Sequence, residues 1–478
     1  MLLKHSGGYL LARIVPAAVS FASLVLYTRL LSPADYGIYV LVIAAVSLVK
    51  ALMFSWLDMA LLRIMPAHRE RPQALLGTVL GIYLLLVVAS GIAGVAAAAL
   101  WPDPVIAKLI AFGIPLLWAH AWFELNLTLA QAKLMPGRYG LMMCARALVT
   151  LGLGATLILW GAGAYAPLIG FCAGSMLGGV AIAAWDWRGI RPRLDGPLSR
   201  QLTHYGIPLT GTIALAFVLD AADRFMISAM IGEEAVGPYA AAYDLTAQSL
   251  TMLMMIVNLA AYPLAVKAYE EGGMAKADRQ IRQNGAMLMA VALPATTGIV
   301  ILAAGIAGVF LGPAFRDTGA QILPWIAVAM LLAGMREYFF DLAFQLKRRT
   351  GLLICGPAVA AVSNILLNLW WIPKYGVVGA AWATLTSYLI ALLVCIVVGQ
   401  QLLPIRPDWS QLVRIVAATV AMGAVLLLLP ALEGVLGMIE QIAAGALVYA
   451  ACAVLLNVMG ARTCLLRRLG IARPGTCG

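Results

Sequence analysis

Charged residues are scarce in this chain. Of its 478 residues only 11% are charged, whereas 63% are hydrophobic, and the mean hydropathy is +0.94. A soluble globular domain carries about 25% charged residues, so this composition excludes a soluble domain and predicts a polytopic membrane protein. We expect an all-α fold, because lipid offers no hydrogen-bond partners to the backbone and a helix satisfies its own peptide groups.

The motifs of metal, disulfide and nucleotide chemistry are also missing. The seven cysteines form no C-x-x-C pair and most lie in apolar runs, which argues against a metal site and against a disulfide framework. There is no Walker A sequence, and no gap between apolar runs is long enough for a nucleotide-binding domain. We therefore expect no cofactor, no catalytic residues and no hydrolysis of ATP by this chain.

Long apolar runs fill most of the sequence. A membrane-spanning helix needs about 20 such residues, and breaks at proline, glycine and charge clusters give fourteen candidates. Their approximate spans are 8–30, 37–61, 74–100, 105–132, 139–160, 167–186, 204–230, 237–262, 284–308, 320–345, 352–371, 377–399, 411–430 and 438–459.

The basic residues alternate from gap to gap along the chain. The odd-numbered gaps hold only Arg29, Lys108, Arg316 and Lys374, whereas the even-numbered gaps and the C-terminal tail are rich in arginine and lysine. By the positive-inside rule, the even gaps and both termini are cytoplasmic. The net charge of +11 is therefore mainly a topology signal, and a nucleic-acid partner is not expected because no gap is long enough to form a basic patch.

A turn and the helix after it recur half a chain apart. Residues 30–48 read LLSPADYGIYVLVIAAVSL and residues 230–248 read MIGEEAVGPYAAAYDLTAQ, so that Gly37 matches Gly237. Six helices separate the copies, an even number, which predicts two lobes of the same orientation, as in transporters with a substrate site between parallel repeats. The predicted parts are 1–200, 201–405, a helix pair at 406–460 and a basic cytoplasmic tail at 461–478.

Three stretches resemble the signatures of one family. TRLLSPADYGIYVLV at 28–42, DRFMISAMIGEEAVGPYAAAYDL at 223–245 and NLWWIPKYGVVGAAWATLTSYLIALL at 368–393 are similar to those of Wzx-type polysaccharide flippases. The resemblance covers residues 1–460. It implies the fold of the multidrug/oligosaccharidyl-lipid/polysaccharide exporter (MOP) superfamily, with two six-helix lobes around a central cavity and two further helices.

The same resemblance implies a function. A flippase of this type sits in the bacterial inner membrane and moves an undecaprenyl-pyrophosphate-linked sugar repeat unit from the cytoplasmic to the periplasmic leaflet, by ion-driven alternating access. Its implied partners are the lipid-linked glycan, membrane lipid, and polysaccharide polymerase and other assembly proteins. The repeat unit can belong to exopolysaccharide, O-antigen or capsule.

Three other functions stay open. A peptidoglycan-precursor flippase shares fourteen helices and a cationic cavity, and a drug exporter of the multidrug and toxin extrusion (MATE) type belongs to the same superfamily. A membrane polysaccharide polymerase or ligase is less favoured, because such an enzyme needs a sizeable outer loop and the longest outward gap, 309–319, has about eleven residues.

Cations at membrane depth are the first site candidates, because an ionisable group there is costly unless it is paired or hydrated. Lys50 lies about 12 residues, or roughly 18 Å, into its helix, with no anion within a turn. It either attracts the phosphate of the cargo or pairs with another helix. Arg13 and Arg29 lie near the two ends of the first helix, and the resemblance favours both as cavity cations.

The seventh helix carries a second group of charges. Asp220, Asp223 and Arg224 share one face, and their distance from the turn places them opposite Asp244. The group is either a clasp of the hairpin or a functional cluster with Arg224 in the cavity. Its surplus of carboxylates favours the second, with Asp220, Asp223 and Asp244 as candidates for coupling to protons or sodium.

The remaining polar residues are predicted as follows. Glu124 and Arg146 are equidistant from their turn and are expected to form a structural salt bridge. Glu337 and Asp341 share a face at a spacing of four, and Arg336 points elsewhere, toward the cavity. We expect Asp58 to be solvated and His120 to pack in the interior. A further set of polar side chains has two alternative roles, either contact with sugar or hydrogen bonds between helices. This set is Asn126, Thr128, Gln131, Gln248, Ser249, Thr251 and Asn258.

Overall fold

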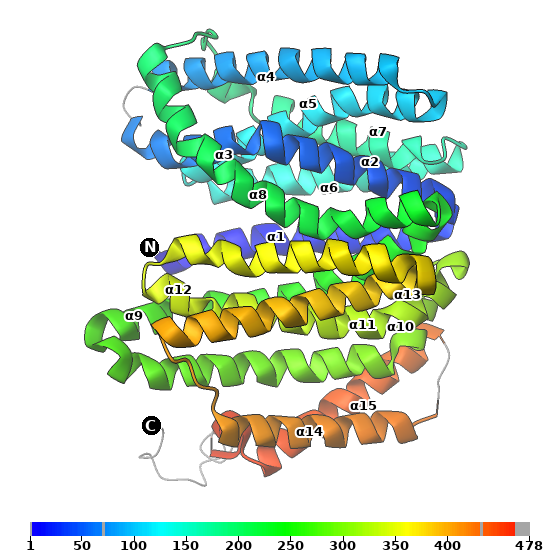
Figure 1. Cartoon of the computed structure of the whole chain (residues 1–478), viewed down its shortest axis with the longest axis vertical. Coiled ribbons are helices and arrows are strands. Elements are labelled where there is room, and N and C mark those ends of the chain that lie inside the picture. Colours follow the sequence, from blue (N-terminus) through cyan, green and yellow to red (C-terminus); the bar gives the residue numbers. More distant parts are fainter. Residues whose placement is uncertain (1, 69–71, 431–433, 464–478) are drawn as a thin grey trace. The chain divides into compact units, whose positions relative to one another are not determined.

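The computed structural model describes residues 2–68, 72–430 and 434–463, without the side chains of 2–14, 212–214, 216–220 and 350. Within this part of the chain the secondary structure is helical throughout (Figure 1). The chain divides into two compact units, the first formed by residues 1–228 and 232–237 and the second by 229–231 and the chain from 238. Most of the predicted basic tail, 464–478, lies outside the described residues.

The first unit contains eight α-helices, with short π and 3-10 turns between some of them. The helices are α1 (Leu2–Leu30), α2 (Pro33–Met53), α3 (Ser55–Ile64), α4 (Pro72–Leu100), α5 (Pro104–Ala132), α6 (Pro136–Leu159), α7 (Tyr165–Met176) and α8 (Gly196–Met230). Helix α5 packs against α2, α3, α4 and α7, so it is the central helix of this unit.

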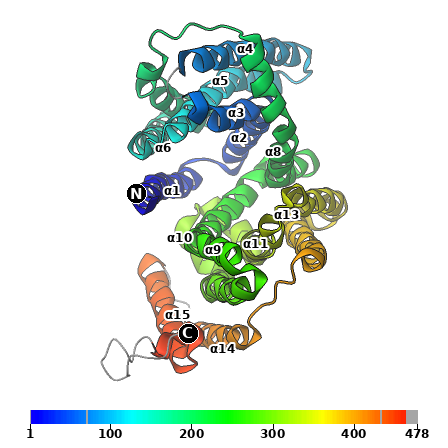
Figure 2. The same ribbon diagram turned by 90° about the vertical axis from the view of Figure 1, so that its left-hand side faces the viewer.

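The second unit contains most of a very long helical segment, whose first residues, up to Gly237, belong to the first unit. Its helices are α9 (Glu233–Ile301), α10 (Ala303–Phe310), α11 (Arg316–Met335), α12 (Leu342–Leu346), α13 (Cys355–Leu402), α14 (Trp409–Leu428) and α15 (Gly434–Leu455), with a π turn, η5 (Arg336–Phe340), between α11 and α12. Helix α11 packs against α13, and α14 packs against α15 (Figure 2).

Glycine divides the two longest helical segments. In α9 the backbone leaves the helical conformation at Gly272 and Gly273, and Gly273 has φ +58. In α13 the break is at Gly376, where φ is +60. Because this left-handed region is readily available only to glycine, a side chain at either position would strain the turn. Both breaks fall in gaps that the hydropathy pattern predicts.

Capping residues explain where several helices begin. Ser32 precedes Pro33 at the start of α2 and accepts a hydrogen bond from the Asp35 amide at 3.1 Å. Asp103 does the same for Val105 at 2.7 Å before Pro104 opens α5. A polar cap followed by proline satisfies an amide at the helix start and presets the backbone angle of the first turn.

The helices have the length and composition of membrane spans. Nine helical segments in the described ranges are long and apolar enough to cross a bilayer, with α9 and α13 counted once each. The protein is thus an all-α, multi-pass membrane protein, as its composition predicts. The total of fourteen spans and the cytoplasmic position of both termini stay predictions.

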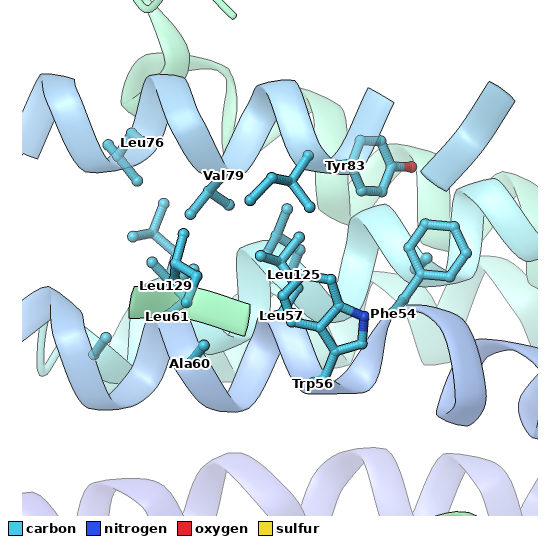
Figure 3. Packing of buried hydrophobic residues seen from close by; sticks show 14 of the residues in the cluster. Phe54, Trp56, Leu57, Ala60, Leu61, Leu76, Val79, Tyr83, Leu125 and Leu129 are labelled. Atoms are coloured by element: carbon cyan, nitrogen blue, oxygen red, sulfur yellow. The ribbon is translucent and has the colours of Figure 1, made fainter. Parts of the chain in front are cut away.

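The interior of the first unit is built around α5. Its main hydrophobic cluster includes Phe54, Leu57, Leu61, Val79 and Leu125 from α3, α4, α5 and the α2–α3 junction (Figure 3). Between helices in lipid, such side chains stabilise by van der Waals packing and not by transfer from water. This packing fixes α3 against α5 and sets the position of the polar residues that the two helices carry.

The two glycines of the repeated turn meet. A Cβ atom on Gly37 would contact the carbonyl oxygen of Glu233, and one on Gly237 would contact the carbonyl oxygen of Pro33. Residues 232–237 belong to the first unit, so this is a contact within it. The glycines are needed because the starts of α2 and α9 approach each other backbone to backbone.

Candidate functional site

A buried ion pair lies at the end of α2. The Lys50 Nζ is 2.8 Å from the Asp58 Oδ2, and the two side chains are 11% and 5% exposed. Lys50 also donates a hydrogen bond of 3.1 Å to the hydroxyl of Ser55. The lysine therefore has a carboxylate and a hydroxyl as partners inside the first unit.

A helix break brings these residues together. Helix α2 ends at Met53 and α3 begins at Ser55, with Phe54 between them at φ -115. On a straight helix eight residues span about 12 Å, too far for Lys50 to reach Asp58 directly. The change of direction at Phe54 returns the first turn of α3 toward Lys50, so the pair depends on the break.

This pair corrects one prediction from the sequence. The sequence predicts that Asp58 is solvated near Arg63, but Asp58 is 4% exposed and bound to Lys50. The physical reason is the break at Phe54, which a continuous helix over 37–61 would lack. A useful signal was present, since Asp58 is a carboxylate inside an apolar run that also contains a lysine.

A second ion pair joins helices α5 and α6 of the same unit. Arg146 Nη1 on α6 is 3.0 Å from Glu124 Oε1 on α5, which is the contact that the hairpin spacing predicts. The Arg146 guanidinium lies 4.2 Å from the centre of the Phe123 ring. Lys50 is close enough to Glu124 to interact with it electrostatically, so the two pairs form one polar group, which we call the first-unit network.

His120 is a member of this network that the sequence analysis assigned to packing. Its ring does pack on Phe171, with centroids 5.2 Å apart, but it also interacts electrostatically with Glu124, Arg146 and Lys50. Its Nδ1 is buried and has no hydrogen-bond partner among the described residues. The spacing of four on α5 places His120 and Glu124 on the same face of the helix, and this is the signal that the sequence offers.

The charges of the network balance. Two cations face two carboxylates, and such pairing lowers the cost of placing charge among apolar helices. Neither Lys50 nor Arg146 therefore presents an uncompensated positive charge in this structure. An anion can use Lys50 only by competing with Asp58, or by binding while the pair is open. The predicted role of Lys50 in attracting phosphate remains a hypothesis.

The second unit has its own buried pair, which corrects another prediction. Arg336 Nη1 is 3.1 Å from Asp341 Oδ2, and their side chains are 13% and 6% exposed. The sequence predicts that Asp341 shares a face with Glu337 and that Arg336 points elsewhere. Instead the π turn η5 adds one residue to the turn, the Asp341 amide donates to the Arg336 carbonyl at 2.8 Å, and residues five apart align.

The other predicted site residues belong to both units or lie outside the described residues. The side chains of Arg13 and Asp220 are outside the described residues. Arg29 is exposed in the last turn of α1. In the first unit Asp223 is buried and Arg224 is partly buried, and in the second unit Asp244 is partly buried. Their roles as cavity cation and ion-coupling carboxylates stay predictions.

Comparison with known sequences gives one family and one relative. The chain matches a family of polysaccharide biosynthesis proteins over residues 26–319. It is 23% identical over 321 residues to a protein of Haloferax volcanii named as a probable low-salt glycan biosynthesis flippase, Agl15. That alignment covers 66% of this chain and 66% of the relative, just under two thirds of its length.

Comparison with solved structures identifies the fold. The lipid II flippase MurJ, in an inward closed conformation, is similar with a TM-score of 0.78, over 96% of this chain and 99% of that one, at 14% identity. An inward-facing MATE-family multidrug resistance transporter of the MOP superfamily is similar with a TM-score of 0.59, over 81% of this chain and 94% of that one, also at 14% identity. The fold is therefore that of MOP-superfamily transporters.

Proposed function

Because the chain belongs to the polysaccharide biosynthesis protein family, we propose that it is a flippase for a lipid-linked oligosaccharide, and not an enzyme. The proposed cargo is a sugar repeat unit on undecaprenyl pyrophosphate, moved from the cytoplasmic to the periplasmic leaflet of the cytoplasmic membrane. Membership of the family is the observation that carries the proposal. The relative named as a glycan biosynthesis flippase and the transporter fold support it.

The physical task of such a protein matches the first-unit network. The polyprenyl tail can remain in lipid, but the sugar and the pyrophosphate need polar groups at membrane depth. Lys50, Asp58, Glu124 and Arg146 supply such groups in a form that is stable without cargo, because each cation has a carboxylate partner. In this proposal the pyrophosphate displaces Asp58 from Lys50 during transport.

Movement between inward-open and outward-open states is proposed to use an ion gradient. A proton or sodium ion would bind one of the carboxylates Asp220, Asp223 or Asp244 in one state and leave it in the other. Binding with different affinity in the two states is what allows an ion to shift their populations.

The second candidate is a peptidoglycan-precursor flippase. The fold similarity to the lipid II flippase spans nearly the whole chain, and the fold is compatible with either cargo. A MATE-like drug exporter is the third candidate. The three differ in cargo, so one set of strains separates them.

The experiment is complementation of a bacterial strain that lacks its repeat-unit flippase, in several glycan backgrounds. We expect the wild-type protein to restore glycan at the cell surface in at least one background. A strain depleted of its lipid II flippase and a drug-sensitive strain are tested in parallel. Rescue of only the lipid II strain, or of only the drug-sensitive strain, would replace the proposed cargo.

A further inference from the structure

A partly open cavity lies in the second unit, apart from its buried ion pair, and two of its lining residues, Tyr262 and Glu337, are exposed. It has a volume of about 170 Å³ and is lined by Asn258, Tyr262, Glu337, Tyr338, Leu342 and Gln345. A second hollow shares four of these residues and extends between the two halves of α9 to Asn284. The cavity is thus lined by the first half of α9, by η5 and by α12, and the second hollow adds residues from the second half of α9.

Five of the residues that line this cavity have polar side chains. Among the residues that the structure describes, no hydrogen bond or ion pair is formed by the side chains of Asn258, Tyr262, Glu337, Tyr338 or Gln345. The amide of nearby Asn284, in contrast, donates to the Ala261 carbonyl at 2.7 Å and accepts from Gln280 at 2.9 Å. Polar groups that converge on a hollow without satisfying one another are free to bind a ligand.

The π turn explains why Glu337 and Tyr338 line the cavity. It aligns Arg336 with Asp341, and Arg336 forms its ion pair there. Glu337 is thereby left without a salt bridge and beside the cavity, together with Tyr338. Single π turns inside α-helices are frequent at functional sites.

The cavity lies near the cytoplasmic surface by the topology that the charges predict. Glu337 is 21 residues beyond Arg316 at the start of α11, or about 32 Å along the helix. The basic run Lys347, Arg348 and Arg349 follows shortly after it. A cavity at this depth is accessible from the leaflet in which the cargo is made.

The chemistry of the lining selects the ligand class. Two amides, two phenol hydroxyls and one carboxylate offer donors and acceptors, and no lysine or arginine lines the cavity. Sugar hydroxyls both donate and accept hydrogen bonds, whereas phosphate needs donors and is repelled by a carboxylate. We propose that this cavity binds a sugar residue of the lipid-linked glycan on the cytoplasmic side, with the glycan and not the pyrophosphate as its ligand. This inference rests on the proposed function.

The test uses the full-length protein in lipid nanodiscs and saturation-transfer-difference NMR. The probes are methyl β-glucoside, methyl β-galactoside and methyl N-acetyl-β-glucosaminide, with inorganic pyrophosphate as competitor. We expect transfer to the protons of at least one sugar and no competition by pyrophosphate. Glu337→Gln and Asn258→Leu should each weaken that binding about tenfold, the effect of losing one good hydrogen bond to a ligand.

The matched control is Glu440→Gln, which removes an exposed carboxylate on α15 in the same unit. It should bind the sugar as the wild type does, and the thermal unfolding of all variants should be unchanged. Equal binding by Glu337→Gln and the wild type, competition by pyrophosphate, or no transfer to any sugar would overturn the inference. Complementation separates this failure from that of the proposed function: a wild type that rescues surface glycan but binds no sugar here refutes only the inference, whereas one that rescues no glycan background refutes the proposed function.

Discussion

Removing the charge of Asp58 is expected to destabilise the first unit strongly. In the variant Asp58→Asn the size of the side chain is kept, but Lys50 loses its carboxylate and retains the hydroxyl of Ser55. Removing one partner of a buried ion pair typically costs about 3–5 kcal/mol, because the other charge stays buried and uncompensated. We expect a loss of stability in this range.

The distance sets the size of the attraction. At 2.8 Å two unit charges attract by about 6 kcal/mol at an effective dielectric constant of ~20. Desolvation of the two ions costs several kcal/mol for each and offsets most of this gain. The double variant Lys50→Met/Asp58→Val removes attraction and desolvation together, so we expect it to be within about 2 kcal/mol of the wild type.

The assay is thermal unfolding of the purified full-length protein, with wild type, single and double variants compared. The control is Lys267→Met, which breaks a pair with Glu271 at 3.7 Å whose side chains are 72% and 53% exposed. An exposed pair of this kind contributes at most about 1 kcal/mol. A single variant as stable as the wild type, or a double variant as unstable as the single, would refute the reasoning.

Complementation by the same double variant separates two roles of Lys50. If Lys50 serves only to neutralise Asp58, the stable double variant should still restore surface glycan. If Lys50 also binds the pyrophosphate, as proposed, the double variant should fold normally and fail to transport. Retained transport by a folded double variant would remove the phosphate role.

Three further changes test local features. Gly37→Ala should cost about 1–3 kcal/mol in thermal unfolding, because its Cβ would meet a facing carbonyl oxygen, whereas Gly152→Ala, with open space around it, should cost nothing. Arg336→Met should lower the free energy of unfolding by about 3–5 kcal/mol, because buried Asp341 loses the cation that pairs with it. An unfolding temperature equal to that of the wild type would contradict this role of the ion pair. Asp408→Ala should speed amide exchange in α14 by removing a cap worth about 1 kcal/mol. The Ser410 hydroxyl holds the pKa of Asp408 below its usual value. The stabilisation of α14 by this cap should therefore be complete above about pH 4, and it should be lost as the pH falls through the lowered pKa.

The architecture was predictable because it follows from composition and from the geometry of hairpins. Apolar runs separated by charged gaps predict helices, and the gaps between runs coincide with the glycine breaks at Gly273 and Gly376. The contact of Glu124 with Arg146 was also predictable. In an antiparallel pair of regular helices joined by a short turn, residues at equal distance from the turn face each other.

The other two ion pairs were not predictable from periodicity. Lys50 meets Asp58 across a helix break, and Arg336 meets Asp341 across a π turn, so both pairs join residues that a regular helix separates. Neither interruption contains glycine or proline, the residues that usually mark one. Only the tertiary structure reveals these interruptions, because their cost is balanced by contacts made far away in the sequence.

The two interruptions have a common physical consequence. Each brings a cation and a carboxylate of the same helical run into contact, where a regular helix would leave both charges to find partners on other helices or in water. At both places the backbone stays hydrogen-bonded, because the Phe54 amide donates to the Lys50 carbonyl at 2.9 Å and the Asp341 amide donates to the Arg336 carbonyl at 2.8 Å. The irregular turns thus pair the buried charges. At η5 the same extra residue also turns Arg336 away and leaves Glu337 beside a polar cavity. Local departure from regular helix geometry thus accompanies two of the buried ion pairs in the described part of the chain.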